Sequence, residues 1–132
     1  MNDNLAHARG WLRKADSDLA AARRLLAGRG PFDAVCFHAQ QSAEKDLKAL
    51  LAFAERPIPH THNVEELLGW CLELQPTSGL SGLDVVELTP YAVQMRYDFE
   101  FWPDQATAVG AVALAERVRQ AVRDMLPSAA LP

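Results

Sequence analysis

The stretch from Pro31 to Phe53, PFDAVCFHAQQSAEKDLKALLAF, constrains the fold more than any other part of the chain. Wound as an α-helix of about 3.6 residues per turn, it places its small and apolar side chains on one face, at alternating steps of three and four. These side chains are Phe32, Cys36, Ala39, Ala43, Leu47, Leu50 and Ala54. The pattern predicts a helix that turns this face toward a hydrophobic core.

Polar side chains interrupt the predicted core face of this helix. Gln40 and Glu44 lie four positions apart and project within or beside the apolar stripe, and Lys48 continues the same line at its polar edge. A buried amide or carboxylate without a partner costs about 1–3 kcal/mol, so these side chains need partners. An ion pair between Glu44 and Lys48 is the simplest arrangement and stabilises an exposed helix by roughly a few tenths of a kcal/mol.

Arg96, followed by Tyr97 near the end of a later helical segment, is the best candidate to pair with Glu44. A guanidinium beside a bundle core can bind a buried carboxylate through two parallel hydrogen bonds. Two interpretations stay open at this point: Arg96 is a structural tie, or Glu44 holds it toward a cleft where it contacts phosphate. The aromatic side chains around Arg96 either pack in a core or stack on bases. They are Tyr91, Phe99, Phe101 and Trp102.

The remaining segments also predict helices. A heptad-like repeat of Leu and Ala from Asn4 to Ala27 predicts a long amphipathic helix, and Gly28 is placed to end it in a left-handed C-cap. Gly30-Pro31 then begins the next helix, and a link this short makes the first two helices antiparallel.

Two further helical segments follow the proline-rich loop after Phe53. Asn63 and Glu66 have the spacing of a capping box, which predicts a helix through Leu74. A second segment, residues 83–97, contains Pro90, which kinks it or restarts it with Thr89 as cap. Its expected inward side chains are Leu83, Val86, Tyr91, Met95 and Phe99.

Asp104 is placed to cap the last helix. The apolar positions expected along that helix are Val109, Val112, Leu114, Val118, Ala121, Val122 and Met125. Together the segments predict one all-α domain over residues 1–127, an up-and-down bundle of four to five helices, and a frayed tail at residues 128–132.

Composition narrows the function classes. The formal net charge of −4 argues against a general, sequence-independent grip on nucleic acid, although a locally basic cleft stays open. No apolar run is long enough to cross a bilayer, and we expect no membrane association. Two cysteines, Cys36 and Cys71, fall on expected apolar faces, which predicts free thiols in a reducing cytoplasm.

The sequence offers little support for metal or hydrolase chemistry. His60 and His62 lie in a proline-flanked loop, where a histidine packs on or caps a helix start far more often than it binds metal, and His38 lies elsewhere. No Gly-rich phosphate loop is present, and no Ser or Cys nucleophile is matched by a base and an orienting acid. We therefore expect no metal and no cofactor.

Several segments together resemble the HEPN domain. They are Phe32-Asp33-Ala34, CFHAQQSAEKDLKALL, His62 before a helix with Leu67-Leu68, and LTPYAVQMRY, in the family's order over nearly the whole chain. The resemblance implies a small helical bundle that dimerises with a cleft between subunits, and an association with nucleotide binding, RNA cleavage in toxin systems and minimal nucleotidyltransferases. Ribonuclease members carry an Arg followed by a His a few positions on. Arg96 matches that Arg, but residues 97–102 contain no His, and Asp98 replaces a frequent Pro.

Our leading hypothesis is a cytoplasmic, homodimeric HEPN-type module that binds a nucleotide or RNA and works with a nucleotidyltransferase partner in a toxin–antitoxin-like system. Its expected nucleotide-binding residues are Gln40, Glu44, Lys48, Arg96 and Tyr97. We expect binding rather than catalysis because the His is missing. The alternatives are a metal-independent ribonuclease toxin and a non-catalytic helical interaction protein whose buried polar groups set dimer register.

Overall fold

The computed structural model describes residues 3–132, and within this range every regular element is a helix. The five α-helices are α1 (Asn4–Ala27), α2 (Phe32–Phe53), α3 (Val64–Leu74), α4 (Tyr91–Tyr97) and α5 (Gln105–Asp124). Two short 3₁₀ helices are η1 (Val86–Leu88) and η2 (Ser128–Ala130). The predicted all-α bundle is confirmed.

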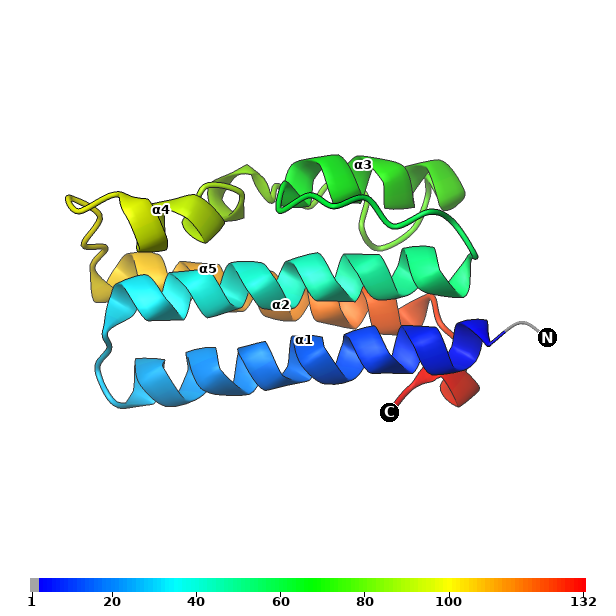
Figure 1. Cartoon of the computed structure of the whole chain (residues 1–132), viewed down its shortest axis with the longest axis horizontal. Helices are drawn as coiled ribbons and strands as arrows, with labels where there is room; N and C mark the ends of the chain where they lie inside the picture. Colours follow the sequence, from blue (N-terminus) through cyan, green and yellow to red (C-terminus); the bar gives the residue numbers. More distant parts are fainter. Residues whose placement is uncertain (1–2) are drawn as a thin grey trace.

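α2 lies at the centre of the bundle and contacts all four other α-helices. Figure 1 shows α1 antiparallel to α2 on one side, α3 and α4 end to end on the other, and α5 behind. The C-terminus lies beside the start of α1. Since α2 is covered from several directions, it buries far more than one stripe, including polar positions that a surface helix would expose.

The apolar pattern of α1 gives the expected face. Ala8, Leu12, Ala15, Leu19 and Ala22 are buried, as the heptad-like repeat predicted. Small alanines alternate with leucines along this face, and this lets α1 pack along the length of α2. Both cysteines are buried free thiols, and burial raises the pKa of Cys36 to about 11 and that of Cys71 to about 12.

Two of the three predicted helix starts carry the expected side-chain cap. Asn63 Oδ1 accepts a hydrogen bond from the Glu66 amide at 2.9 Å, and Asp104 Oδ1 accepts one from the Thr107 amide at 2.8 Å. Thr89 does not cap α4: its hydroxyl lies 3.4 Å from the backbone nitrogen of Glu65 and accepts a hydrogen bond in the first turn of α3. Thr89 therefore joins α3 to the segment before α4.

The end of α1 also differs from the expectation. Gly28 has φ −85°, and the left-handed residues are the next two, Arg29 at φ 65° and Gly30 at φ 104°. The Gly30 amide donates to the Leu25 carbonyl at 2.7 Å, so the left-handed cap begins at Arg29, one residue later than predicted.

Three expectations about packing are wrong. Val86 and Phe99 are 54% and 85% exposed, because the helical period assumed for residues 83–99 is broken by η1 and by the end of α4. The tail 128–132 does not fray as expected: it contains η2, buries Ala130, and is held by a 2.6 Å hydrogen bond from Arg9 Nη1 to the carbonyl of residue 129.

Asp46 is a buried carboxyl that the helical pattern did not reveal. It lies two positions beyond Glu44, about 200° round α2, and is fully buried with no hydrogen-bond partner for either oxygen in residues 3–132. Nearby, Asp16 accepts hydrogen bonds from Arg119 at 3.0 Å and from Arg123 at 2.6 Å. Burial, then the charge of Asp16, raises the pKa of Asp46 to about 8 despite the two arginines. This carboxyl is therefore largely protonated at neutral pH.

We expect Asp46→Asn to stabilise the protein at neutral pH and to flatten its stability profile. Between about pH 4 and pH 8 the folded chain keeps a proton on Asp46 that the unfolded chain releases, so stability falls as pH rises, by at most about 1.4 kcal/mol per pH unit. Above that window this contribution is constant. Urea unfolding across the range measures it, with exposed Asp124→Asn as the control; parallel curves for wild type and Asp46→Asn would contradict the assignment.

Candidate polar centre of α2

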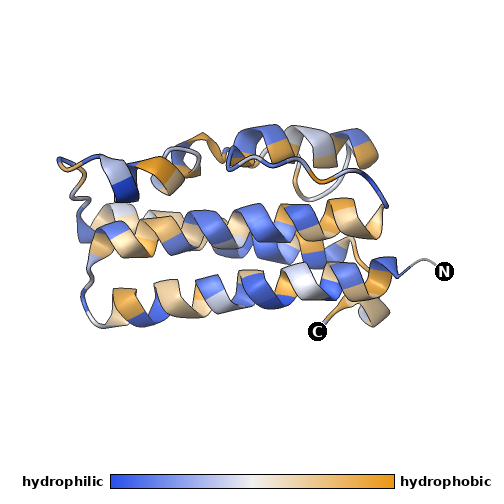
Figure 2. Ribbon diagram, viewed as in Figure 1, coloured by the Kyte–Doolittle hydropathy of each residue, from blue (hydrophilic) through white to orange (hydrophobic). Residues whose placement is uncertain are grey.

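The polar side chains of α2 meet at the middle of the bundle, where Figure 2 shows hydrophilic bands along the central helix. Gln40 and Glu44 are 0% and 2% exposed, and Lys48 is 7% exposed. Lys48 Nζ lies 3.2 Å from Glu44 Oε2, and Gln40 Nε2 donates to Glu44 Oε1 at 3.2 Å. The i, i+4 spacing within one helix creates both contacts. The expected Glu44–Lys48 pair forms, but it is buried rather than at the surface.

His62 is the third partner of Glu44. It lies in the loop between α2 and α3, directly before the N-cap Asn63, and its Nδ1 is 2.8 Å from Glu44 Oε1. An ionised carboxylate can only accept hydrogen bonds. In the contact with Glu44, His62 is therefore the donor, and its Nδ1 carries the hydrogen. The side chain of His62 is 59% exposed, whereas that of Glu44 is 3% exposed. The buried carboxylate of Glu44 therefore holds the exposed imidazole of His62 in place from the interior of the bundle.

Amide side chains complete the contacts behind His62. Gln40 Nε2 also donates to the His62 carbonyl at 3.0 Å, so one amide group contacts both the carboxylate and the loop. Gln41 Nε2 donates to Gln40 Oε1 at 2.7 Å and thereby sets the orientation of that amide. The loop before α3 is held by its backbone and by its side chain at the same point of α2.

The expected pairing of Arg96 with Glu44 is wrong. Glu44 is bound by His62, Lys48 and Gln40, and no ion pair of Arg96 occurs within residues 3–132. Arg96 is exposed instead, with its guanidinium carbon 5.1 Å from the centroid of the Phe37 ring. Phe37 lies on α2 about one turn before Gln41, so α4 sits over an earlier part of α2 than His62 does.

The aromatic side chains near α4 divide into two groups. The ring of Tyr91 stacks on Phe101 at a centroid distance of 5.6 Å, and burial raises the pKa of Tyr91 to about 12. Tyr97, Phe99 and Trp102 are 71%, 85% and 74% exposed. The cluster thus provides packing at its base and an exposed aromatic surface above, and Arg96 rests on Phe37 rather than among these rings.

A second carboxylate, that of Asp18, has a similar set of partners on α2. Asp18 of α1 contacts His38 Nδ1 at 2.9 Å and Lys45 Nζ at 2.6 Å. His38 and Lys45 are seven positions apart on α2 and so lie on one face. Among the described residues, no group of three His, Cys, Asp or Glu side chains is arranged to hold a metal ion.

The geometry permits two kinds of chemistry. His62 has one ring nitrogen committed to Glu44 and is otherwise at the surface, which is the arrangement of an oriented proton acceptor or donor. Arg96 is a guanidinium supported by an aromatic ring, an arrangement suited to anions.

None of the helices in residues 3–132 is long and apolar enough to span a membrane.

Fold and site together define a small all-α domain whose central helix carries a buried polar cluster. The sequence model of the HEPN domain family matches residues 8–125, nearly the whole chain, and the protein belongs to this family. Its structure is similar to the crystal structure of TT1696 from Thermus thermophilus, with a TM-score of 0.72 and 28% sequence identity over 96% of this chain and 100% of that one. A comparison with curated proteins finds no significant match.

Sequence reasoning found Gln40, Glu44 and Lys48 of α2 but not the contact of Glu44 with His62. The signal was present, since His62 directly precedes the capping box of α3 and a histidine there was expected to pack on a helix start. It was not joined to Glu44 because the charge of an arginine made Arg96 the stronger candidate for a buried carboxylate.

Removing the carboxylate should destabilise the fold strongly. Glu44→Ala leaves Lys48 buried without its counter-charge and takes the acceptor from His62, so we expect the free energy of unfolding to fall by about 3–5 kcal/mol. The double variant Glu44→Ala with Lys48→Met should recover a large part of the loss. Chemical denaturation measures both, with exposed Glu73→Ala as a control. A loss as small as in that control would contradict the buried cluster.

Proposed function

We propose that the protein is a binding module for a nucleotide or a nucleic acid, with Arg96 and Tyr97 in contact with the ligand. The observation that carries this proposal is the exposed Arg96 guanidinium 5.1 Å from the Phe37 ring. A guanidinium resting on an aromatic ring keeps its fork of N–H donors free for phosphate oxygens. Tyr97, the next residue, is 71% exposed and offers a ring for a base to stack on.

Gln40, Glu44 and Lys48 act behind the ligand in this proposal. They are too deeply buried to contact a large ligand, but they hold His62 at the surface on the same side of α2. His62 can then donate or accept a hydrogen bond with a phosphate or a base edge, at a point further along α2 than Arg96. The proposed binding surface therefore consists of Arg96 and Tyr97 near Phe37, together with His62 near Glu44.

Partners are part of the same proposal. HEPN membership supports a homodimer working with a minimal nucleotidyltransferase in a toxin–antitoxin-like system in the cytoplasm, where the thiols of Cys36 and Cys71 stay reduced. Exposed apolar side chains at α4 and in the loop after it offer a surface for such contacts. They are Val93, Tyr97, Phe99 and Trp102.

Arg96→Ala should weaken binding of a short single-stranded oligonucleotide at least tenfold, because a charge-assisted hydrogen bond is worth about 1.5–3 kcal/mol. Arg96→Lys should recover the charge but only part of the affinity, since a lysine lacks the planar fork. Calorimetric titration at fixed low salt measures the affinities. Arg117→Ala, which removes an exposed arginine from α5, is the matched control. Equal loss in that control would show that only net charge matters.

A second candidate function is RNA cleavage without a metal, and the His62–Glu44 contact is the observation that favours it. Without a histidine after Arg96 the sequence offered no obvious base for the ribose 2′-hydroxyl, and His38 or His62 could replace it only if folded near Arg96. The Nδ1–H group of His62 donates to a buried carboxylate, which leaves Nε2 as the acceptor. Nε2 can therefore take the proton of the ribose 2′-hydroxyl as the 2′-oxygen attacks the adjacent phosphorus. The 5′-oxygen leaves with a proton from water.

If the protein cleaves RNA, His62→Ala should abolish the activity, and Glu44→Gln should lower it by weakening the hold on the imidazole. His60→Ala is the matched control, because it changes an exposed histidine two positions away in the same loop. Gel analysis of a labelled RNA in excess chelator gives the rates. RNA that stays intact with wild-type protein would eliminate this second function and leave the binding proposal standing.

A further inference from the structure

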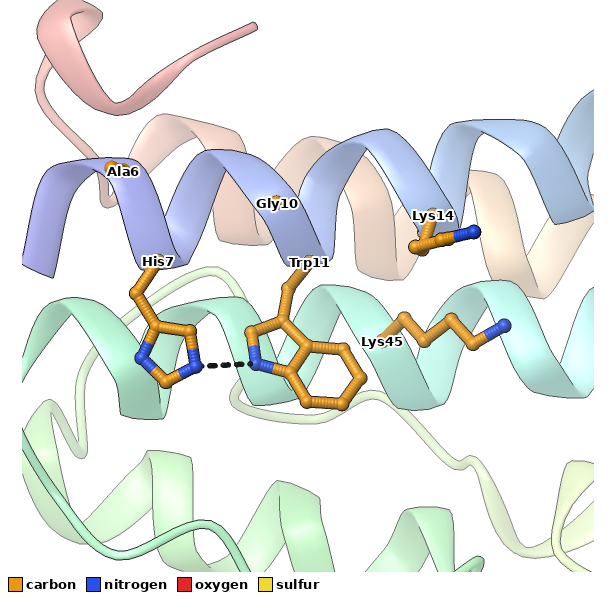
Figure 3. A pocket seen from close by; sticks show the side chains of 6 residues that line it. All are labelled: Ala6, His7, Gly10, Trp11, Lys14 and Lys45. Carbon is orange, nitrogen blue, oxygen red and sulfur yellow. Dashed lines mark hydrogen bonds between the residues drawn. The ribbon is translucent and has the colours of Figure 1, made fainter.

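A separate groove opens between α1 and α2, away from Arg96. Its cavity measures about 580 Å³, within the usual range of roughly 300–1,000 Å³ for small-molecule sites. It is lined by Ala6, His7, Gly10, Trp11, Lys14 and Lys45 (Figure 3). None of these side chains is among the residues proposed above to contact the ligand, which are Arg96, Tyr97 and His62.

Trp11 is the central side chain of this groove, and its position is set by two contacts. Its indole Nε1–H donates to His7 Nε2 at 3.2 Å, which Figure 3 shows as a dashed line. Lys48 Nζ lies 5.4 Å from the ring centroid, and because Lys48 is buried it contacts the indole from the inner side. The partly exposed indole is therefore a fixed aromatic surface that lines the cavity.

Two lysines place positive charge beside this ring. Figure 3 shows Lys14 from α1 and Lys45 from α2 on the same side of the indole. Lys14 is exposed, and Lys45 contacts Asp18 through one oxygen at 2.6 Å. An ammonium has three donors, so the contact with Asp18 leaves two on Lys45 for a ligand. Figure 3 shows both lysine side chains directed away from the indole along α1, so an anionic group held between Lys14 and Lys45 would lie beyond the ring rather than against it.

Gly10 lines the groove without a side chain, although packing within the protein does not require a glycine at this position. A Cβ atom at this position would meet nothing within 4 Å, and Gly10 lies well inside the long helix α1. A glycine inside a helix costs about 0.5–1 kcal/mol relative to alanine, and packing within the chain does not require it here. The open space at Gly10 lets a flat group approach the backbone of α1 beside Trp11.

We infer that this groove binds a planar aromatic ring that carries a phosphate: the ring stacks on Trp11 and the phosphate lies between Lys14 and Lys45. A free mononucleotide and the terminal nucleotide of a single strand share this chemistry. The inference rests on the proposed function, to which it adds a second subsite built from other residues. Stacking supplies affinity without base specificity, and the two lysines supply the preference for a charged ligand.

Gly10→Leu tests the inference because Gly10 lines the groove and a Cβ atom there would meet nothing within 4 Å, which leaves room for a larger side chain to occupy the groove. We expect the variant to be folded and at least as stable as wild type, and its affinity for AMP to fall at least tenfold in calorimetric titrations. Gly110→Leu is the matched control, since Gly110 also lies inside a helix with nothing within 4 Å of its Cβ position. Lys14→Glu, a surface change, should weaken AMP binding and leave any binding of adenosine nearly unchanged, and it decides the matter if Gly10→Leu fails to fold.

The ligands in the titration separate the possible sources and outcomes. Tighter binding of AMP than of inorganic phosphate or adenosine supports the paired ring and phosphate contacts, and a gain from AMP to a short oligonucleotide identifies the end of a strand as the ligand. AMP binding that Gly10→Leu and Lys14→Glu leave unchanged but Arg96→Ala removes overturns this groove and retains the proposed function. If Gly10→Leu loses AMP binding while Arg96→Ala keeps the wild-type affinity, the result supports the groove as the AMP site and contradicts the proposed role of Arg96. No binding of any of these ligands by wild type overturns both.

Discussion

The structure depends on the buried carboxylate of Glu44. An isolated charge of this kind would cost several kcal/mol, and here three donors satisfy it: Gln40 one turn before, Lys48 one turn after, and His62 from the loop before α3. Two of these donors come with the helix itself. The third requires the chain to return across α2 after Phe53, and Gln40 binds the His62 carbonyl as well. The same contacts that stabilise the charge therefore determine where α3 begins.

Side chains at the surface are supported from α2 in three places. Glu44 lies behind His62, Phe37 lies beneath Arg96, and Lys48 lies on the inner side of Trp11. In each case a group that can meet a ligand is held by a residue of the central helix, so little side-chain freedom remains to be lost on binding. Because α2 is packed against every other α-helix, it is the element least able to move. The functional proposals for this HEPN protein all rest on that rigidity.

Much of the fold follows from local sequence patterns, whereas the site follows only in part. The core face of α1 and the caps at Asn63 and Asp104 were predicted, because each depends on residues a few positions apart. The need of Glu44 for a partner was also predicted, but its long-range partner was not. Arg96 and His62 were both eligible by chemistry, and the choice between them depends on where α4 and the loop cross α2.

By itself the sequence determined that this chain forms amphipathic helices, that its second helix carries polar groups into a core, and that those groups require partners. Helix periodicity and capping act over three or four residues, so they can be recognised without coordinates. Only the tertiary structure decided which groups meet: the Glu44–His62 contact joins residues 18 positions apart, and Asp46 is buried only because α2 is enclosed by its neighbours. The Trp11 groove likewise exists only where α1 and α2 lie side by side. Burial is a property of the assembled bundle, and no pattern within one helix contains it.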